Sequence, residues 1–201
     1  LLRNFEFAQS GQKEIFMEFK KVDFDDLRMN PHTLFSKDWM VLTAGDCEKY
    51  NPMTVSWGQM GSLWFGENAK GFNGLPVVTV YVRPSRFTKP IIDERPFFTL
   101  SVLDEKYRKE LAFLGTESGR DYPDKLAACG LSPEFIDESV AVAQAKMIFV
   151  CRKIYVGPIE ERGFVDKSMI PDNYPKKDFH DFYIGEIVGT YLSLKKQEPS
   201  E

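Results

Sequence analysis

The order of apolar and polar residues along the chain predicts many short strands with a few helices between them. Runs of strand length that are apolar, β-branched or aromatic occur at residues 39–44, 51–57, 76–82, 97–103, 140–143, 145–156 and 180–194. Helical spacing or short helical turns occur at residues 87–94, 105–114 and 125–129. Short, mostly antiparallel strands favour a closed barrel, because closure hides the sheet edges. We therefore expect a mainly β protein with peripheral helices.

Local signals refine this pattern. The runs at 39–44 and from Asn51 onward are separated by a polar loop and predict an antiparallel hairpin. Gly115-Thr116 predicts the end of the helix that begins at Glu105, Gly185 predicts an irregularity in the last strand, and Asn30-Pro31 predicts a break after a turn or short helix at 24–27. Strand 145–156 should place alternate side chains on opposite faces, with Ile148, Val150 and Arg152 on one and Met147, Phe149 and Cys151 on the other.

Composition limits the class of protein. With 43% hydrophobic residues, the 201-residue chain is large enough for one buried core, so we expect a single domain over 1–201, with an N-terminal arm at 1–30 and a polar tail at 195–201. A net charge of −4 provides no basic stripe for nucleic acid or an anionic membrane. No apolar run approaches the ~20 residues of a membrane span and no signal-peptide pattern is present, so we expect a cytoplasmic protein.

The cysteines support the same compartment. Three cysteines, an odd number without C-x-x-C spacing, fit a reducing environment better than a disulfide framework. We expect them to be core residues without a redox role.

The stretch from Asn51 to Gly58 is the first with chemical content. Because side chains alternate along a strand, Thr54 and Ser56 share a small, hydroxylic face. The opposite, apolar face carries Met53, Val55 and Trp57. In an ordinary half-buried strand the hydroxyls would simply face outward, and Met53 and Trp57 are expected to pack in the core.

The stretch from Tyr81 to Thr88 is the second one with residues that indicate a chemical role. A strand runs into Pro84 and is followed by a hydroxyl, Arg, aromatic, hydroxyl sequence before a helical pattern. Ser85, Arg86 and Thr88 provide the hydroxyls and guanidinium that a bound phosphate needs. The alternatives are a solvated Arg86 and helix caps at Ser85 and Thr88. Together the two stretches predict a pocket for a phosphorylated, flat ligand.

Three motifs in this order resemble the flavin reductase-like family of FMN-binding split barrels, with flavoredoxin-type members as the nearest likeness. The motifs are Asn51-x-Met53-Thr54-x-Ser56-Trp57-Gly58, Val80-Tyr81-Val82-Arg83-Pro84-Ser85-Arg86-Phe87-Thr88, and Ser118-Gly119-Arg120-Asp121 with Lys125. The likeness extends over about residues 39–191. It implies an antiparallel, Greek-key-like split β-barrel and a homodimer with the flavin near the subunit interface.

The resemblance also implies site residues. FMN needs charge-assisted hydrogen bonds for its phosphate and an apolar slot for its ring. In the family, the segment from Ser118 to Lys125 lies near the phosphate or ribityl chain, although the tetrapeptide by itself predicts only a turn. The predicted cofactor-binding residues are Asn51, Met53, Thr54, Val55, Ser56, Trp57, Arg83, Ser85, Arg86, Thr88, Ser118, Gly119, Arg120 and Lys125.

His180 is the candidate catalytic residue. Asp178-Phe179-His180 is similar to a Gly-Asp-His element of many flavin reductases, with Asp in place of Gly, and implies a position on the nicotinamide side. Ser101 stands where many family members have Asn, so no role is assigned to it. The chain has two histidines, His32 and His180, without the spacing of metal ligands, so we expect no metal site.

These observations predict an NAD(P)H-dependent flavoprotein oxidoreductase that passes electrons through FMN to a flavin, a metal complex or a protein acceptor. No G-x-G-x-x-G fingerprint follows a strand, so the sequence does not choose between NADH and NADPH. Two alternatives to this prediction stay open. The first is an FMN-bound electron-transfer module that is reduced by a redox partner protein, and the second is a ligand-binding barrel without flavin.

Overall fold

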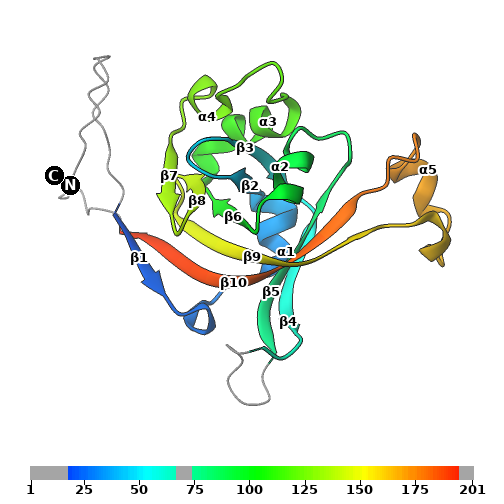
Figure 1. Ribbon diagram of the computed structural model, residues 1–201, viewed down its shortest axis with the longest axis horizontal. Coiled ribbons are helices and arrows are strands. Elements are labelled where there is room, and N and C mark those ends of the chain that lie inside the picture. The colour runs from blue at the N-terminus through cyan, green and yellow to red at the C-terminus, as the bar shows by residue number, and fades with distance from the viewer. Residues whose placement is uncertain (1–17, 67–73, 195–201) are drawn as a thin grey trace.

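The computed structural model describes residues 18–66 and 74–194, which form one antiparallel eight-stranded sheet with helices around it (Figure 1). The strand order is β3-β2-β6-β9-β10-β5-β4, and β1 also pairs with β10. These strands are β1 (Glu18–Val22), β2 (Met40–Gly45), β3 (Tyr50–Val55), β4 (Gly58–Leu63), β5 (Leu75–Val82), β6 (Phe97–Val102), β9 (Met147–Pro158) and β10 (Asp181–Leu194). A second, two-stranded sheet pairs β7 (Pro133–Ile136) with β8 (Ser139–Val142).

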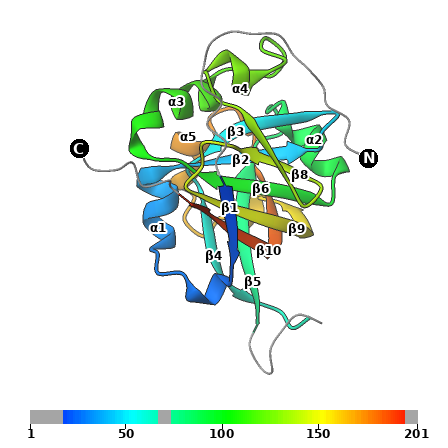
Figure 2. The same cartoon turned by 90° about the vertical axis from the view of Figure 1, so that its left-hand side faces the viewer.

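The helices are short and lie around the sheet. Figures 1 and 2 both place α3 and α4 next to each other above β3, and Figure 1 shows α5 far from them, at the end of a projecting arm. The helices are α1 (Pro31–Thr33), α2 (Thr88–Glu94), α3 (Arg108–Thr116), α4 (Lys125–Ala128) and α5 (Met169–Asn173). Single turns occur as 3-10 helix at Phe24–Asp26, Glu105–Tyr107 and Glu161–Gly163, and as π-helix at Leu34–Asp38.

Strand β10 joins the two sides of the sheet. It pairs with β9 along most of its length, with β5 through its first half and with β1 through its second half. The register shifts between Ile184 and Gly185, as the sequence predicted, and again between Ile187 and Gly189. A Cβ at Gly185 would lie 2.8 Å from the Phe98 ring, so glycine is required for this close packing.

Alternation along β9 divides the core in two, as predicted. Phe149 and Cys151 face a buried cluster that fills the space enclosed by the curved sheet, together with side chains of β2, β5 and β6. Ile148 and Val150 face the other way and belong to a second buried cluster, which also contains Leu111 and Leu114 of α3. The helix α3 is therefore held against the outer face of the sheet by apolar burial.

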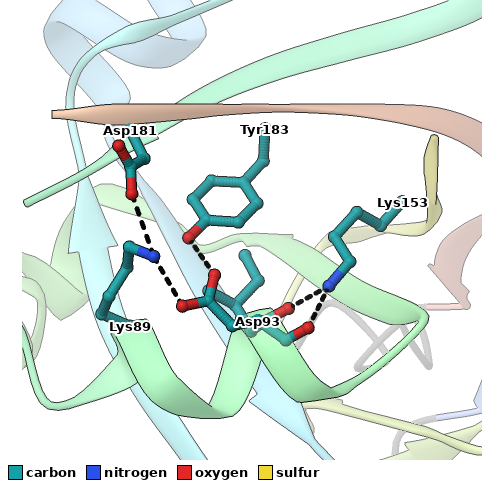
Figure 3. Close-up of polar contacts among 6 residues, drawn as sticks. Lys89, Asp93, Lys153, Asp181 and Tyr183 are labelled. Carbon is teal, nitrogen blue, oxygen red and sulfur yellow. Dashed lines mark hydrogen bonds and ion pairs between the residues drawn. The ribbon is translucent and has the colours of Figure 1, made fainter. Parts of the chain in front are cut away.

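A polar network ties α2 to the long strands (Figure 3). Lys89 Nζ lies 2.5 Å from an Asp93 carboxylate oxygen and 2.9 Å from an Asp181 carboxylate oxygen. The Tyr183 hydroxyl donates to the Asp93 carboxylate at 2.6 Å. Lys153 Nζ donates to the Asp93 carbonyl oxygen at 2.7 Å, so it satisfies a backbone acceptor in the last turn of the helix.

Most predicted elements are confirmed, including the hairpin of β2 and β3. Helix α3 ends at Thr116, as the Gly115-Thr116 pair predicted, and Glu117 donates its backbone N–H to the Phe113 carbonyl oxygen and closes the last turn. The turn Phe24–Asp26 ends before Asn30-Pro31, as predicted, and Pro31 then begins α1 with Asn30 as its N-cap.

Burial corrects two expectations. Trp57 lies beyond the end of β3 and is 43% exposed, so it is not a core residue. Cys151 is buried, but Cys129 is only partly buried and Cys47 is exposed. Within the described residues, no helix is long and apolar enough to cross a membrane.

Candidate functional site

The three sequence motifs meet at the start of β3. The Asn51 side-chain amide donates to the Thr88 hydroxyl of α2 at 2.7 Å, and both residues are buried. A Cβ at Gly119 would lie 2.2 Å from Asn51 Oδ1 and 2.4 Å from the Phe87 ring. Only glycine allows this turn to approach so closely. The sequence predicted the members of this cluster, and the fold brings them together.

Helix α3 runs beside β3 and closes the same region. The Thr54 hydroxyl donates to the Leu111 carbonyl oxygen at 2.6 Å, and a Cβ at Gly115 would lie 3.3 Å from Thr54. Arg86 Nη1 donates to the Gly115 carbonyl oxygen at 3.0 Å. Arg86 therefore stands at the C-terminal end of α3, where a cation is favoured by the helix dipole.

Cationic and hydroxyl groups lie around the C-terminal end of α3 and the turn at Gly119. The Arg120 guanidinium lies 5.4 Å from the centre of the Phe87 ring, and the Arg120 backbone N–H donates to the Ser118 hydroxyl at 3.2 Å. Arg86, Arg120 and Ser85 are exposed, so their donors are open to an anion from solvent. Within the described part of the chain, no side chain caps α2, which removes the capping alternative for Ser85 and Thr88.

Lys125 is buried, with only 3% of its surface exposed to solvent. Its Nζ donates to the Leu114 carbonyl oxygen at 2.7 Å and to the Pro52 carbonyl oxygen at 3.1 Å. Two of the three ammonium donors are thus used to hold α3 and the end strand β3 together. Burial, and next the charge of Arg86, lower the pKa of Lys125 to about 8.

An aromatic pocket of about 560 Å³ lies at the other end of β3. Its lining residues come from the α1 region, from the β3–β4 connection and from β5, and they are His32, Phe35, Ser36, Trp39, Ser56, Trp57, Gly58 and Tyr81. A Cβ at Gly58 would lie 2.2 Å from the Phe35 ring, so glycine lets that ring close one side of the pocket. In the described residues, no Lys or Arg lines this pocket.

His180 stands behind one wall of this pocket. Its ring centre is 5.0 Å from that of Trp57, and His180 Nδ1 is 2.9 Å from the Tyr174 hydroxyl. His180 is 8% exposed; burial, and next the charge of Arg83, lower its pKa to about 4. The imidazole is therefore neutral near pH 7.

Arg83 follows β5, and its side chain reaches the projecting arm around α5 instead of the phosphate-type cluster, which is the group of Asn51, Ser85, Arg86, Thr88, Ser118, Gly119 and Arg120. It forms a 2.7 Å ion pair with Asp178, donates to the Asn173 carbonyl oxygen at 2.8 Å and lies over the Tyr174 ring. These contacts fasten the segment around α5 to the end of β5. Met53 and Val55, also predicted as cofactor-binding, direct their side chains into the core.

Sequence reasoning missed Trp39, His32 and Tyr174. Trp39 marked only the start of an apolar run, His32 was considered only as a metal ligand, and Tyr174 lies in a segment without periodicity. Within residues 18–66 and 74–194, no group of His, Cys, Asp and Glu side chains is placed to hold a metal ion.

Comparisons with known proteins place the fold. No protein-family model matches the chain, and no curated protein does. Among solved structures, the FMN-binding domain of a flavin reductases-like enzyme from Shewanella baltica OS155 matches with a TM-score of 0.59 and 18% identity, over 89% of this chain and 79% of that one. The chain has the split-barrel fold.

Other split barrels match at similar levels. Flavoredoxin of Desulfovibrio vulgaris (Miyazaki F) has a TM-score of 0.55 and 21% identity, over 77% of this chain and 68% of that one. The NADH:FAD oxidoreductase SgcE6 of Streptomyces globisporus has a TM-score of 0.57 and 16% identity, over 77% of this chain and 75% of that one. These likenesses confirm the predicted split barrel. At such low identity they show the fold alone, and function must be argued from the residues.

Proposed function

We propose that this split barrel is an FMN-binding oxidoreductase of the flavin reductase-like type. The observation that carries the proposal is that the phosphate-type cluster and the aromatic pocket lie at opposite ends of β3. Asn51 belongs to the cluster and Ser56 to the pocket, about 16 Å apart, since an extended chain advances ~3.3 Å per residue. A ligand with a phosphate, a flexible chain and a flat ring fits that order of groups.

The phosphate end rests on two exposed guanidiniums. Arg86 reaches the Gly115 carbonyl oxygen and Arg120 follows Gly119 in the turn and lies over the Phe87 ring, with the Ser85 and Ser118 hydroxyls close by in the chain. Because Gly119 has no side chain, the turn packs directly on Asn51 and Phe87. Lys125 adds positive charge from below while it holds β3 and α3 in place.

The ring end rests on β3 and the pocket. β3 is the last strand of the sheet path, and beyond Pro52, whose carbonyl oxygen already accepts from Lys125, we place the polar side of the ring beside Ser56 and Trp57, on one side of the pocket. When bound, FMN supplies the redox chemistry. The chain positions it and keeps neutral His180 behind Trp57, which fixes the wall on the side where we propose that the nicotinamide enters.

The electron donor and acceptor are the next question. We propose NADH or NADPH as the transient donor, supported by the NADH:FAD oxidoreductase activity in the name of the similar SgcE6 protein. A free flavin, a metal complex or a protein is the proposed acceptor.

The pocket also favours a second candidate function, an electron-transfer module that is reduced by a partner protein. Among the described residues, no Lys or Arg lines the pocket to bind the pyrophosphate of a dinucleotide.

The homodimer and the cytoplasmic location stay predictions. Size-exclusion chromatography with light scattering measures the first, and fractionation of cells measures the second. A monomer in solution with and without FMN would contradict the dimer.

The decisive experiment compares FMN with riboflavin, which lacks the phosphate. We expect the purified protein to retain FMN after gel filtration and to quench its fluorescence on binding. The paired substitutions R86A and R120A should weaken FMN binding by about tenfold or more and leave riboflavin binding unchanged, because each lost charge-assisted bond is worth ~1.5–3 kcal/mol. R162A, at a remote side chain that is 83% exposed, is the matched control.

The donor is tested with the same FMN-loaded protein under anaerobic conditions. Rapid bleaching of the flavin by NADH or NADPH supports the reductase and names the donor, whereas bleaching only by a protein or chemical reductant supports the electron-transfer module. A wild-type protein that binds neither FMN nor riboflavin would overturn the proposed function in favour of a barrel without flavin.

A further inference from the structure

The backbone of Trp39 is in a conformation that bulky residues avoid. Its φ is 62° and its ψ is 156°, a region that is almost restricted to glycine. Trp39 directly follows the π-helical turn Leu34–Asp38. Such turns are rare in proteins, and those that occur are often found at functional sites. A strained tryptophan persists only where its surroundings hold it.

Arg108, the first residue of α3, provides that hold. Its Nη1 donates to the Lys37 carbonyl oxygen at 2.6 Å and to the Asp38 carbonyl oxygen at 3.2 Å, the last two residues of the π-helical turn. Its guanidinium lies 3.5 Å from the centre of the Trp39 ring. One side chain therefore fixes both the backbone before Trp39 and the ring itself, in a stacked arrangement that Lys does not reproduce.

The ring held in this way lines the aromatic pocket. Trp39 shares the pocket with Trp57 and Tyr81, and the remaining lining side chains are small, apolar or hydroxylic apart from His32. Packing against the α3 side explains why Trp39 is half-buried. It does not explain why a tryptophan, and not a glycine, occupies this backbone conformation at the pocket.

We propose that Trp39 is a binding residue for a second flat, uncharged heteroaromatic ring in this pocket, and that Arg108 is the positioning residue that holds it. The aromatic lining, without Lys or Arg among the described residues, fits such a ring better than a charged group. This inference rests on the proposed function for the neighbouring ring of FMN. The second ring is either the nicotinamide of a donor or the ring of a flavin acceptor.

The test measures binding, not turnover. FMN-saturated protein is titrated by calorimetry with nicotinamide and, separately, with lumiflavin, which has the flavin ring without the phosphate chain. The titrations distinguish a donor pocket from an acceptor pocket. Trp39→Gly removes the ring at a backbone conformation that glycine adopts freely, and Trp39→Phe keeps an aromatic ring. Trp64→Ala is the matched control, because Trp64 also has a positive φ of 53° but lies outside the pocket, against Tyr155.

We expect one probe to bind the wild type and W64A equally, W39G about tenfold more weakly, and W39F at an intermediate level, with FMN retention unchanged throughout. R108A should weaken the same probe. Because Arg108 acts through Trp39, the double substitution W39G/R108A should bind no more weakly than W39G alone, whereas a general structural role would make the two losses additive.

Three results would overturn the inference. Equal probe affinities in W39G and the wild type would exclude Trp39 from the site. Loss of FMN together with the probe would assign Trp39 to the first ring. An FMN-retaining wild type that binds neither probe would overturn the second-ring site and leave the proposed function standing, whereas a wild type without FMN would overturn the proposed function itself. If W39G does not fold, W39F and R108A decide by the same comparison.

Discussion

The Asn51 side-chain amide and the Thr88 hydroxyl share a 2.7 Å hydrogen bond that joins β3 to the first residue of α2. The two residues are distant in the sequence and both are buried, so water does not replace the bond when it is lost. It fixes the relative position of the two motifs from which the candidate phosphate site is built.

Thr88→Val should therefore destabilise the fold. Valine has the shape of threonine without the hydroxyl, so a buried amide loses an acceptor and the free energy of unfolding should fall by about 1–3 kcal/mol. Urea unfolding followed by circular dichroism measures the change. Thr88→Ser keeps the hydroxyl and should lose clearly less; equal losses in the two variants would show that packing, and not the bond, matters.

Gly119→Ala tests the close approach of the Ser118–Asp121 turn. The added methyl group would lie 2.2 Å from Asn51 Oδ1, so the turn must shift, with an expected loss of about 1–3 kcal/mol and weaker FMN binding. Gly163→Ala is the control, because nothing lies within 4 Å of a Cβ there. Thermal melts and FMN fluorescence quenching give the two results, and an unchanged G119A protein would contradict this geometry.

Lys125→Met should change how stability depends on pH. Burial and the charge of Arg86 lower the pKa of Lys125 from 10.5 to about 8, so the folded protein binds fewer protons than the unfolded chain between these values. The wild type should therefore gain stability relative to K125M as pH rises from about 8 to 10.5, by up to ~1.4 kcal/mol per pH unit. Urea unfolding from pH 7 to 10 measures the difference, and parallel curves would show an unshifted Lys125.

His180→Gln tests the buried imidazole at the acid end. Burial, followed by the charge of Arg83, lowers the pKa of His180 from 6.5 to about 4, so the unfolded chain binds more protons between these values. The wild type should lose stability relative to H180Q as pH falls from 6.5 to 4. An NMR titration of the two histidines, assigned with H32Q, measures the pKa directly; a His180 that titrates near 6.5 would contradict the buried position.

Tyr183→Phe removes one bond from the network in Figure 3. The Tyr183 hydroxyl donates to the Asp93 carboxylate at 2.6 Å, and a bond to a charged group is worth about 1.5–3 kcal/mol. We expect a loss of this size in urea unfolding. Tyr155→Phe, at a residue that is 47% exposed, is the control and should change stability by less than ~0.5 kcal/mol. Equal losses of unfolding free energy in Y183F and Y155F would show that the bond between Tyr183 and Asp93 does not stabilise the fold.

Local periodicity predicted the strands well, because alternation is a property of each strand by itself. The two faces of β9 and the irregularity at Gly185 follow from residues within one strand. The same reasoning failed at Trp57. The alternation ends with β3 at Val55, and no local signal marks that end, so the sequence assigned to the core a ring that lies at a pocket.

The candidate site was only partly predictable. Residue types suggested a phosphate for Arg86 and Thr88, and the resemblance added Gly119, but their approach depends on the pairing of distant segments. The pocket depends on a π-helical turn and on the positive φ of Trp39, and the residue that contacts this turn, Arg108, comes from a helix far along the chain. The resemblance placed Arg83 among the cofactor-binding residues, and its contacts with Asn173 and Asp178 could not be foreseen, because these partners lie in a segment without periodicity.

The pairing of β1 with the second half of β10 affects the order of folding during synthesis. Glu18 lies opposite Leu194, so β1 leaves the ribosome long before its partner strand exists. Contacts between such distant segments slow folding, because the intervening chain must be ordered first. Until then, the pairing edge of β1 is exposed to other chains. We therefore expect this strand to be the part of the described chain that most needs protection by a chaperone while translation continues.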